Sequence, residues 1–117
     1  MTEATLSLQV RQIGKAACIL DIEGDITAFS EEALMDAYTE GAGVGVKAVI
    51  LNFTGLEYMN SGGIGLLVTV LVRANRAKQK LLAFGLTEHY QEIFELTRLD
   101  EAIGIYATEA DALAAAV

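Results

Sequence analysis

The sequence is poor in the residues that build disulfide, metal and redox sites. Its 117 residues include one cysteine, Cys18, one histidine, His89, and no proline. A single cysteine forms no internal disulfide and no thiolate metal site, which fits a reducing compartment. With no second histidine or cysteine, we expect no metal site and no cofactor. We interpret Cys18 as a small apolar residue of a buried strand.

Basic residues and long apolar runs are also scarce. Eight lysines and arginines stand against sixteen acidic residues, which gives a formal net charge of -8. This is the wrong sign for a phosphate backbone or an anionic membrane, so we expect no direct nucleic-acid partner. The longest apolar run, residues 64–72, is far shorter than the roughly 20 residues of a spanning helix, so we expect no membrane insertion. The first residues lack the basic and apolar regions of a signal peptide, which predicts a cytoplasmic protein.

The chain has enough apolar material for one folded domain. Apolar residues make up 53% of the sequence and charged residues 21%, which argues against disorder and favours a single domain over residues 1–117. Hydrophobic patterns predict strands at residues 5–13, 16–22, 46–53, 80–84 and 103–106, and helices at residues 30–41, 61–78, 87–99 and 109–116. Gly14 and Lys15 join the first two strands in a hairpin, Gly24 closes the second strand, and residues 54–60 form a loop.

Strands that alternate with helices after an initial hairpin predict the fold class. We expect an α/β domain with a mixed, mostly parallel sheet of four to five strands and about four helices packed on it.

Residues 58–67, Tyr-Met-Asn-Ser-Gly-Gly-Ile-Gly-Leu-Leu, are the most informative segment because they lead from a buried strand into an apolar helix. Asn60 or Ser61 must occupy the helix N-cap. Two interpretations of Ser61 stay open. Spacing alone favours a cap that accepts a hydrogen bond from the first turn. The alternative is a modifiable or anion-binding residue at the positive end of the helix dipole, with Gly62 and Gly63 allowing a partner to approach closely.

Nucleotide-binding and catalytic interpretations are weak. The chain has no Gly-x-x-x-x-Gly-Lys-Ser/Thr segment, and its glycine spacing does not match Gly-x-Gly-x-x-Gly. As a nucleophile, Ser61 would depend on His89 as its base, with Glu88 or Glu92 to orient that base. We therefore predict no enzyme activity and no catalytic residue.

The order of these segments resembles the STAS domain, the fold of bacterial anti-sigma factor antagonists. A strand that ends Leu-Asn-Phe is followed by Tyr-Met-Asn-Ser-Gly-Gly-Ile-Gly, where the family usually has Asp-Ser-Ser-Gly or Asp-Ser-Thr-Gly before Leu-Gly. The resemblance covers essentially the whole chain, including residues 23–25 and 84–99. It implies that Ser61 is phosphorylated by a partner anti-sigma factor, an ATP-bound serine kinase, and that Gly63 is the motif glycine.

Three positions depart from the family pattern. Asn60 replaces the motif aspartate, Gly62 replaces the second hydroxyl residue, and Thr27 stands where the family often has aspartate. The resemblance implies that the unphosphorylated protein sequesters the anti-sigma factor and releases a sigma factor, and that phosphorylation at Ser61 switches it off. The alternative is a kinase-independent STAS scaffold, either stressosome-like or a transporter-accessory module.

The predicted partner surface combines the loop at residues 25–29, the turn at residues 59–65 and the exposed side of the following helix. If the second and third strands are neighbours, their ends bring both segments to one edge of the sheet. A homodimer through this surface is a further expectation, and Gly62→Arg is expected to block docking without unfolding the domain. The predicted contact residues are Asp25, Thr27, Met59, Asn60, Gly62, Gly63, Ile64 and Gly65.

Overall fold

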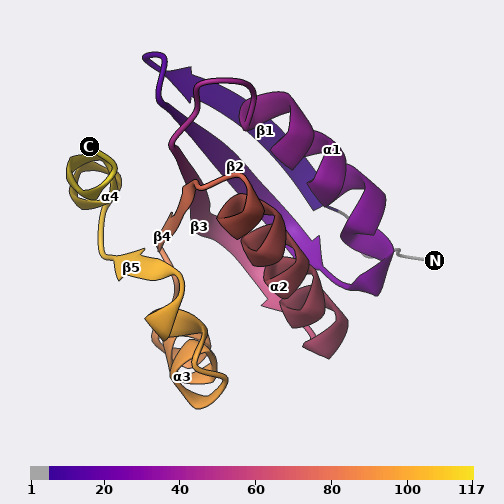
Figure 1. Ribbon diagram of the computed structural model, residues 1–117. Coiled ribbons are helices and arrows are strands. Elements are labelled where there is room, and N and C mark those ends of the chain that lie inside the picture. The colour runs from indigo at the N-terminus through magenta and orange to yellow at the C-terminus, as the bar shows by residue number, and fades with distance from the viewer. Residues whose placement is uncertain (1–5) are drawn as a thin grey trace.

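A five-stranded sheet forms the frame of the molecule (Figure 1). The computed structural model describes residues 6–117. The strands lie in chain order across the sheet; β1 pairs antiparallel with β2, and the remaining neighbours are parallel. Their bounds are β1 Leu6–Ile13, β2 Ala17–Ile26, β3 Ala48–Met59, β4 Lys80–Phe84 and β5 Gly104–Tyr106. The predicted mixed, mostly parallel sheet is confirmed. The first strand was predicted to begin at Thr5, which lies outside the described residues.

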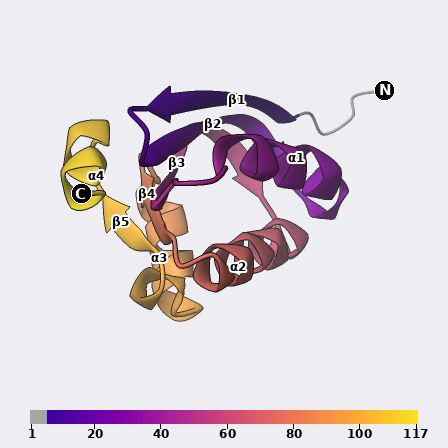
Figure 2. The same ribbon diagram turned by 45° about the horizontal axis from the view of Figure 1, so that its top comes forward.

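The helices lie on both faces of this sheet. Apolar side chains of α1, α2 and α3 share one core with the sheet, and α4 covers a smaller core on the opposite face. Figure 2 shows α1 and α2 together on one side, with α4 apart from them. The bounds are α1 Glu31–Gly41, α2 Ser61–Arg76, α3 Glu88–Leu96 and α4 Glu109–Ala115, with 3-10 turns η1 Ala28–Ser30 and η2 Leu99–Glu101. No helix among residues 6–117 is long and apolar enough to span a bilayer.

The central strands are buried on both faces. Cys18 and Leu20 of β2 point into the larger core, whereas Ile19, between them, and Ile50 of β3 belong to the smaller core. All four side chains are fully buried. Cys18 is therefore the small apolar strand residue expected from the sequence, and burial raises the pKa of its thiol to about 11.

Strands β2 and β3 both run beyond their predicted ends. Gly24 does not close β2; it adopts a φ of 99° beside a shift in register, and the strand continues to Ile26. The segment predicted as a loop pairs instead with this extension, and Ile26 lies opposite Met59. Gly55 permits the close approach, because a Cβ there would lie 2.7 Å from Glu23 Cγ. The two predictions of early strand ends are wrong because pairing between distant segments stabilises the extended backbone.

Arg11 of β1 connects β2 and α4 on the face of the sheet that α4 covers. Its guanidinium donates to Asp21 at 2.6 and 2.8 Å and to Glu109 at 2.8 and 3.3 Å. Asn52 of β3 also donates to Asp21 at 2.7 Å. The hydrogen bonds from Arg11, and to a smaller extent the one from Asn52, hold the pKa of the Asp21 carboxyl below its usual range. Partial burial opposes this shift.

Candidate functional site

The ends of β2 and β3 bring the two predicted binding segments to one edge of the sheet. The strands are parallel neighbours, and Ile26 pairs with Met59 at their carboxyl ends. The backbone N–H of Asn60 donates to the Ile26 carbonyl at 3.3 Å. The loop at residues 25–29 and the turn at residues 59–65 are therefore adjacent, as predicted.

Asn60, and not Ser61, caps α2. Asn60 has extended backbone angles, φ -100° and ψ -174°, and its side chain accepts a hydrogen bond from Gly63 N–H at 3.0 Å. Ser61 is the first residue of the helix, and its side chain is exposed. The interpretation of Ser61 as the cap is wrong, because the residue before it already fills that position.

The backbone at this helix start suits an anionic group on Ser61. Asn60 N–H is bound by the Ile26 carbonyl and Gly63 N–H by the Asn60 side chain. Among residues 6–117, the N–H groups of Ser61 and Gly62 have no protein acceptor. No acidic residue lies in the first turn of α2. A phosphate attached here would meet two donors and the positive end of the helix dipole.

The glycines of the motif have different surroundings. A Cβ on Gly62 would lie 2.9 Å from both the Cβ and the N of Ala28, and one on Gly63 would overlap the Ile26 carbonyl. Their close approach is therefore to η1 and β2 within the chain, not to a partner. Gly65 has open space instead, with no atom within 4 Å of its added Cβ. The expectation that Gly62→Arg leaves the fold intact is incompatible with this packing.

The turn η1 holds the other segment through a pair of hydroxyls. Thr27 Oγ1 accepts from Phe29 N–H at 3.2 Å, and Ser30 Oγ accepts from Thr27 N–H at 3.0 Å. Ser30 Oγ also donates to the Asp25 carbonyl at 3.4 Å. Ser30 occupies the position before α1 but its side chain closes η1 and does not cap α1.

The predicted contact residues fall into buried and accessible groups. Thr27, Met59 and Gly63 are buried, so they lie beneath the surface of the site and present no side chain to a partner. The accessible or half-buried residues are Asp25, Asn60, Gly62, Ile64 and Gly65.

The sequence alone did not indicate a role at the site for two aromatic residues. Tyr90 of α3 accepts a hydrogen bond from Met59 N–H at 2.9 Å, and no local pattern signals this long-range contact. Phe29 of η1 is 97% exposed, a value that only the structure provides.

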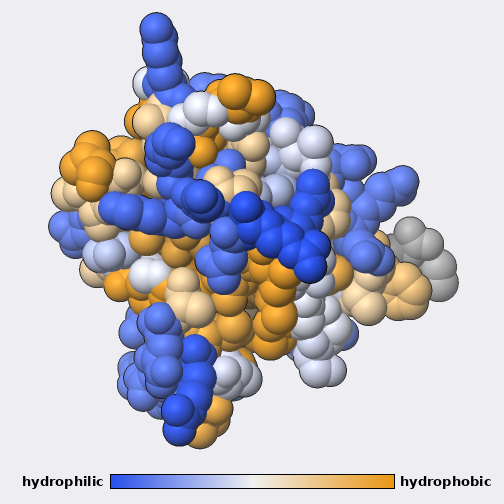
Figure 3. All heavy atoms as spheres, viewed as in Figure 1, coloured by the Kyte–Doolittle hydropathy of each residue, from blue (hydrophilic) through white to orange (hydrophobic). Residues whose placement is uncertain are grey.

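The outer side of α2 continues the site away from Ser61. Val68 and Val72, one helical turn apart, are each 41% exposed. Figure 3 shows hydrophobic surface along the middle of this face, over α2, with hydrophilic side chains around it. Within the described part of the chain, no group of three His, Cys, Asp or Glu side chains could hold a metal ion. The arrangement is an exposed apolar strip along α2 with an exposed serine at its N-terminal end.

Fold and site together define a small α/β domain in which an exposed serine opens the helix after the central parallel strand. The chain belongs to the STAS domain family, whose model matches residues 7–112.

Relatives and solved structures agree with this assignment. The chain is 24% identical over 84 residues to the anti-sigma-B factor antagonist of Staphylococcus aureus, with 72% of this chain and 78% of that protein covered. It is 23% identical over 109 residues to the Listeria monocytogenes anti-sigma-B factor antagonist, covering 91% and 93%.

Among solved structures, an anti-sigma factor antagonist from Mycobacterium paratuberculosis has a TM-score of 0.81 at 19% identity, covering 96% of this chain and 94% of that chain. The Bacillus cell fate determinant SpoIIAA in its phosphorylated form has a TM-score of 0.68 at 18% identity, covering 93% and 98%. These likenesses show that the fold is shared.

Proposed function

We propose that this protein is a non-enzymatic anti-sigma factor antagonist controlled by phosphorylation of Ser61. In the unphosphorylated form it sequesters an ATP-bound anti-sigma factor serine kinase and so releases a sigma factor. The observation that carries the proposal is the exposed Ser61 hydroxyl at the first position of α2, beside two N–H groups without protein acceptors among residues 6–117. The names of the Staphylococcus and Listeria relatives support the choice of partner.

Phosphorylation changes this surface through charge and solvation. A phosphate adds about -1.5 to -2 charges, which the N–H groups and the helix dipole accommodate in the free protein. Docking would remove water from that charge, which costs free energy. The phosphates of a kinase-bound nucleotide would also lie opposite Ser61 and repel the phosphate attached to it. The unmodified hydroxyl carries neither penalty, so modification acts as an off switch.

The departures at Asn60 and Thr27 keep the local geometry that aspartate would provide. Both residues use a side-chain oxygen as a cap, Asn60 for α2 and Thr27 for η1. Asparagine, threonine and aspartate are all effective in this role. The substitutions therefore remove charge while Ser61 stays in position, which supports its role as a phosphoacceptor.

The chemistry in this proposal belongs to the partner. The kinase supplies the nucleotide and catalytic groups, and this chain supplies the hydroxyl and the docking surface. Because sigma factors work on RNA polymerase, the proposal places the protein in the cytoplasm. A homodimer through the exposed side of α2 would cover the same surface and compete with the anti-sigma factor.

The experiment is phosphorylation by purified anti-sigma factors encoded in the same genome. With ATP, at least one of them is expected to add a single phosphate to the wild type and none to Ser61→Ala, as measured by mass spectrometry. Thr69→Ala is the matched control, because Thr69 is another exposed hydroxyl on α2. Modification should persist in that variant. No mass gain with any anti-sigma factor would favour the kinase-independent scaffold, either stressosome-like or transporter-accessory.

A further inference from the structure

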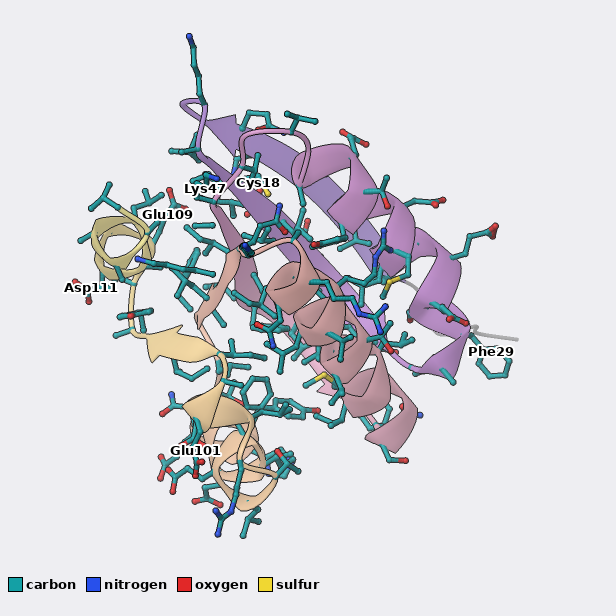
Figure 4. All side chains as sticks on the ribbon, in the orientation of Figure 1. Cys18, Phe29, Lys47, Glu101, Glu109 and Asp111 are labelled. Atoms are coloured by element: carbon teal, nitrogen blue, oxygen red, sulfur yellow. The ribbon has the colours of Figure 1, made fainter. Side chains whose placement is uncertain are left out.

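Phe29 is the most exposed of the large hydrophobic side chains near the site. Its side chain is 97% exposed, and Figure 4 shows the ring directed away from the rest of the molecule. A single exposed apolar residue is ordinary in a soluble protein. The unusual feature of Phe29 is its backbone, which hydrogen bonds within η1 and packing against Gly62 hold in place.

Hydrogen bonds and close packing hold the turn in place. The Thr27 and Ser30 side chains form a reciprocal capping box around η1, and Ser30 N–H adds a backbone bond to the Thr27 carbonyl at 2.9 Å. Ala28 is seated on Gly62, with no space for another carbon between them. A side chain presented on a rigid turn loses little conformational entropy on binding, which favours its use as an anchor.

The same contact fixes Phe29 relative to Ser61. Ala28 and Gly62 touch, and each is the direct neighbour of one of the two residues: Phe29 follows Ala28, and Ser61 precedes Gly62. Phe29 and the phosphoacceptor therefore lie on the same edge of the molecule, joined through one packed contact. A partner that covers both sides of this contact would therefore meet the ring as well as Ser61.

Acidic residues lie before and after Phe29 in the sequence. Glu31 and Glu32 form the exposed first turn of α1 directly after η1, and Asp25 lies before it. The formal net charge of the whole chain, -8, has the same sign. A pocket that accepts Phe29 therefore gains from Lys or Arg side chains on the rim that faces α1.

We propose that Phe29 is the anchor of the docking surface and inserts into an apolar pocket of the anti-sigma factor, with basic side chains on the rim facing Glu31 and Glu32. This inference rests on the proposed function and adds to it the residue that provides most of the contact energy. Aromatic anchors that fill a partner's pocket dominate many interfaces, whereas surrounding residues contribute little. The acidic residues act mainly on the rate of association.

The test measures the affinity and association rate of the purified anti-sigma factors from the same genome for variants of the full chain. Phe29→Ala should weaken binding about 30-fold, and Phe29→Leu should recover part of the loss. Glu32→Lys should slow association, with a reduced dependence on salt. The matched controls are Leu96→Ala, since Leu96 is 84% exposed on α3, and Glu101→Lys, since Glu101 is an exposed acid on η2, far from Phe29 in Figure 4. Both controls should bind like the wild type.

The outcomes separate the anchor from the proposed function. If the wild type binds and Phe29→Ala binds equally well, the anchor is wrong while the function stands. If no anti-sigma factor binds the wild type, both are overturned. The thermal unfolding midpoint of Phe29→Ala should equal that of the wild type, because an exposed ring contributes little packing. A clear drop in the midpoint would show that Phe29 is structural and would contradict the anchor.

Discussion

At the residue scale, Asn60 and Ser61 have separate roles at the start of α2. Asn60 provides the capping oxygen, and Ser61 provides an exposed hydroxyl at the next position. Asn60→Ala should lower the free energy of unfolding by about 1 kcal/mol, the usual contribution of an N-cap. Ser61→Ala should change it by less than about 0.5 kcal/mol, as for most surface substitutions. Urea denaturation measures both, and equal losses would contradict the assignment of the cap.

Gly62 and Gly65 offer a second comparison of neighbouring residues. Gly62→Arg should destabilise the domain, because even a Cβ would lie 2.9 Å from Ala28 backbone N. Gly65→Arg should not lower the unfolding midpoint, since that side chain would enter open space and arginine has the higher helix propensity. It should still block docking of an anti-sigma factor, because Gly65 is exposed one turn beyond Ser61.

Circular dichroism melts and a binding titration test this pair of variants. A stable Gly62→Arg, or a Gly65→Arg that binds normally, would contradict the packing or the docking surface, respectively. The sequence motif alone assigned both glycines to a partner-facing turn. The difference between them arises from η1, whose position depends on contacts that no local pattern encodes.

At the element scale, the ion pairs of Arg11 connect α4 to the sheet and make stability depend on pH. The pKa of Asp21 is lowered in the folded protein, so the unfolded chain takes up the proton first as pH falls. The stabilisation is present above the ordinary carboxyl pKa of about 3.9 and is lost as pH falls through the lower folded value.

Asp21→Asn removes this titration while Arg11 keeps Glu109 as a partner. The variant should be less stable than the wild type at neutral pH, and the difference should shrink below about pH 4. Denaturant titrations across this range measure the effect, with Glu101→Gln on η2 as the control. A difference that is constant with pH would show that Asp21 is not stabilised as a carboxylate.

The lengths of β2 and β3 show where local patterns stop being informative. The strand β4 and the start of α2 agree with the predictions, since apolar runs and a polar turn mark them clearly. Gly24 and residues 54–59 carry turn-like composition, yet they belong to β2 and β3, whose ends pair Ile26 with Met59. The bulges that allow this pairing depend on both strands at once, so a reading of either strand alone misses them.

At the scale of the whole molecule, the order of the strands determines the site. The sequence predicted that neighbouring strands would place residues 25–29 beside residues 59–65, and the parallel pairing of β2 with β3 confirms it. Burial could not be predicted with the same success: Thr27 and Met59 were expected at the surface, but they lie beneath it. A hydroxyl or thioether side chain is compatible with either environment, so its neighbours in the fold decide.

The most direct test of the phosphorylation switch is the affinity of a purified anti-sigma factor for this protein with and without phosphoserine at position 61. The domain should stay folded in both forms, because the helix N-terminus accommodates the phosphate. We predict at least about a tenfold loss of affinity on phosphorylation, equivalent to about 1.4 kcal/mol. Equal affinity of the two forms would contradict the account.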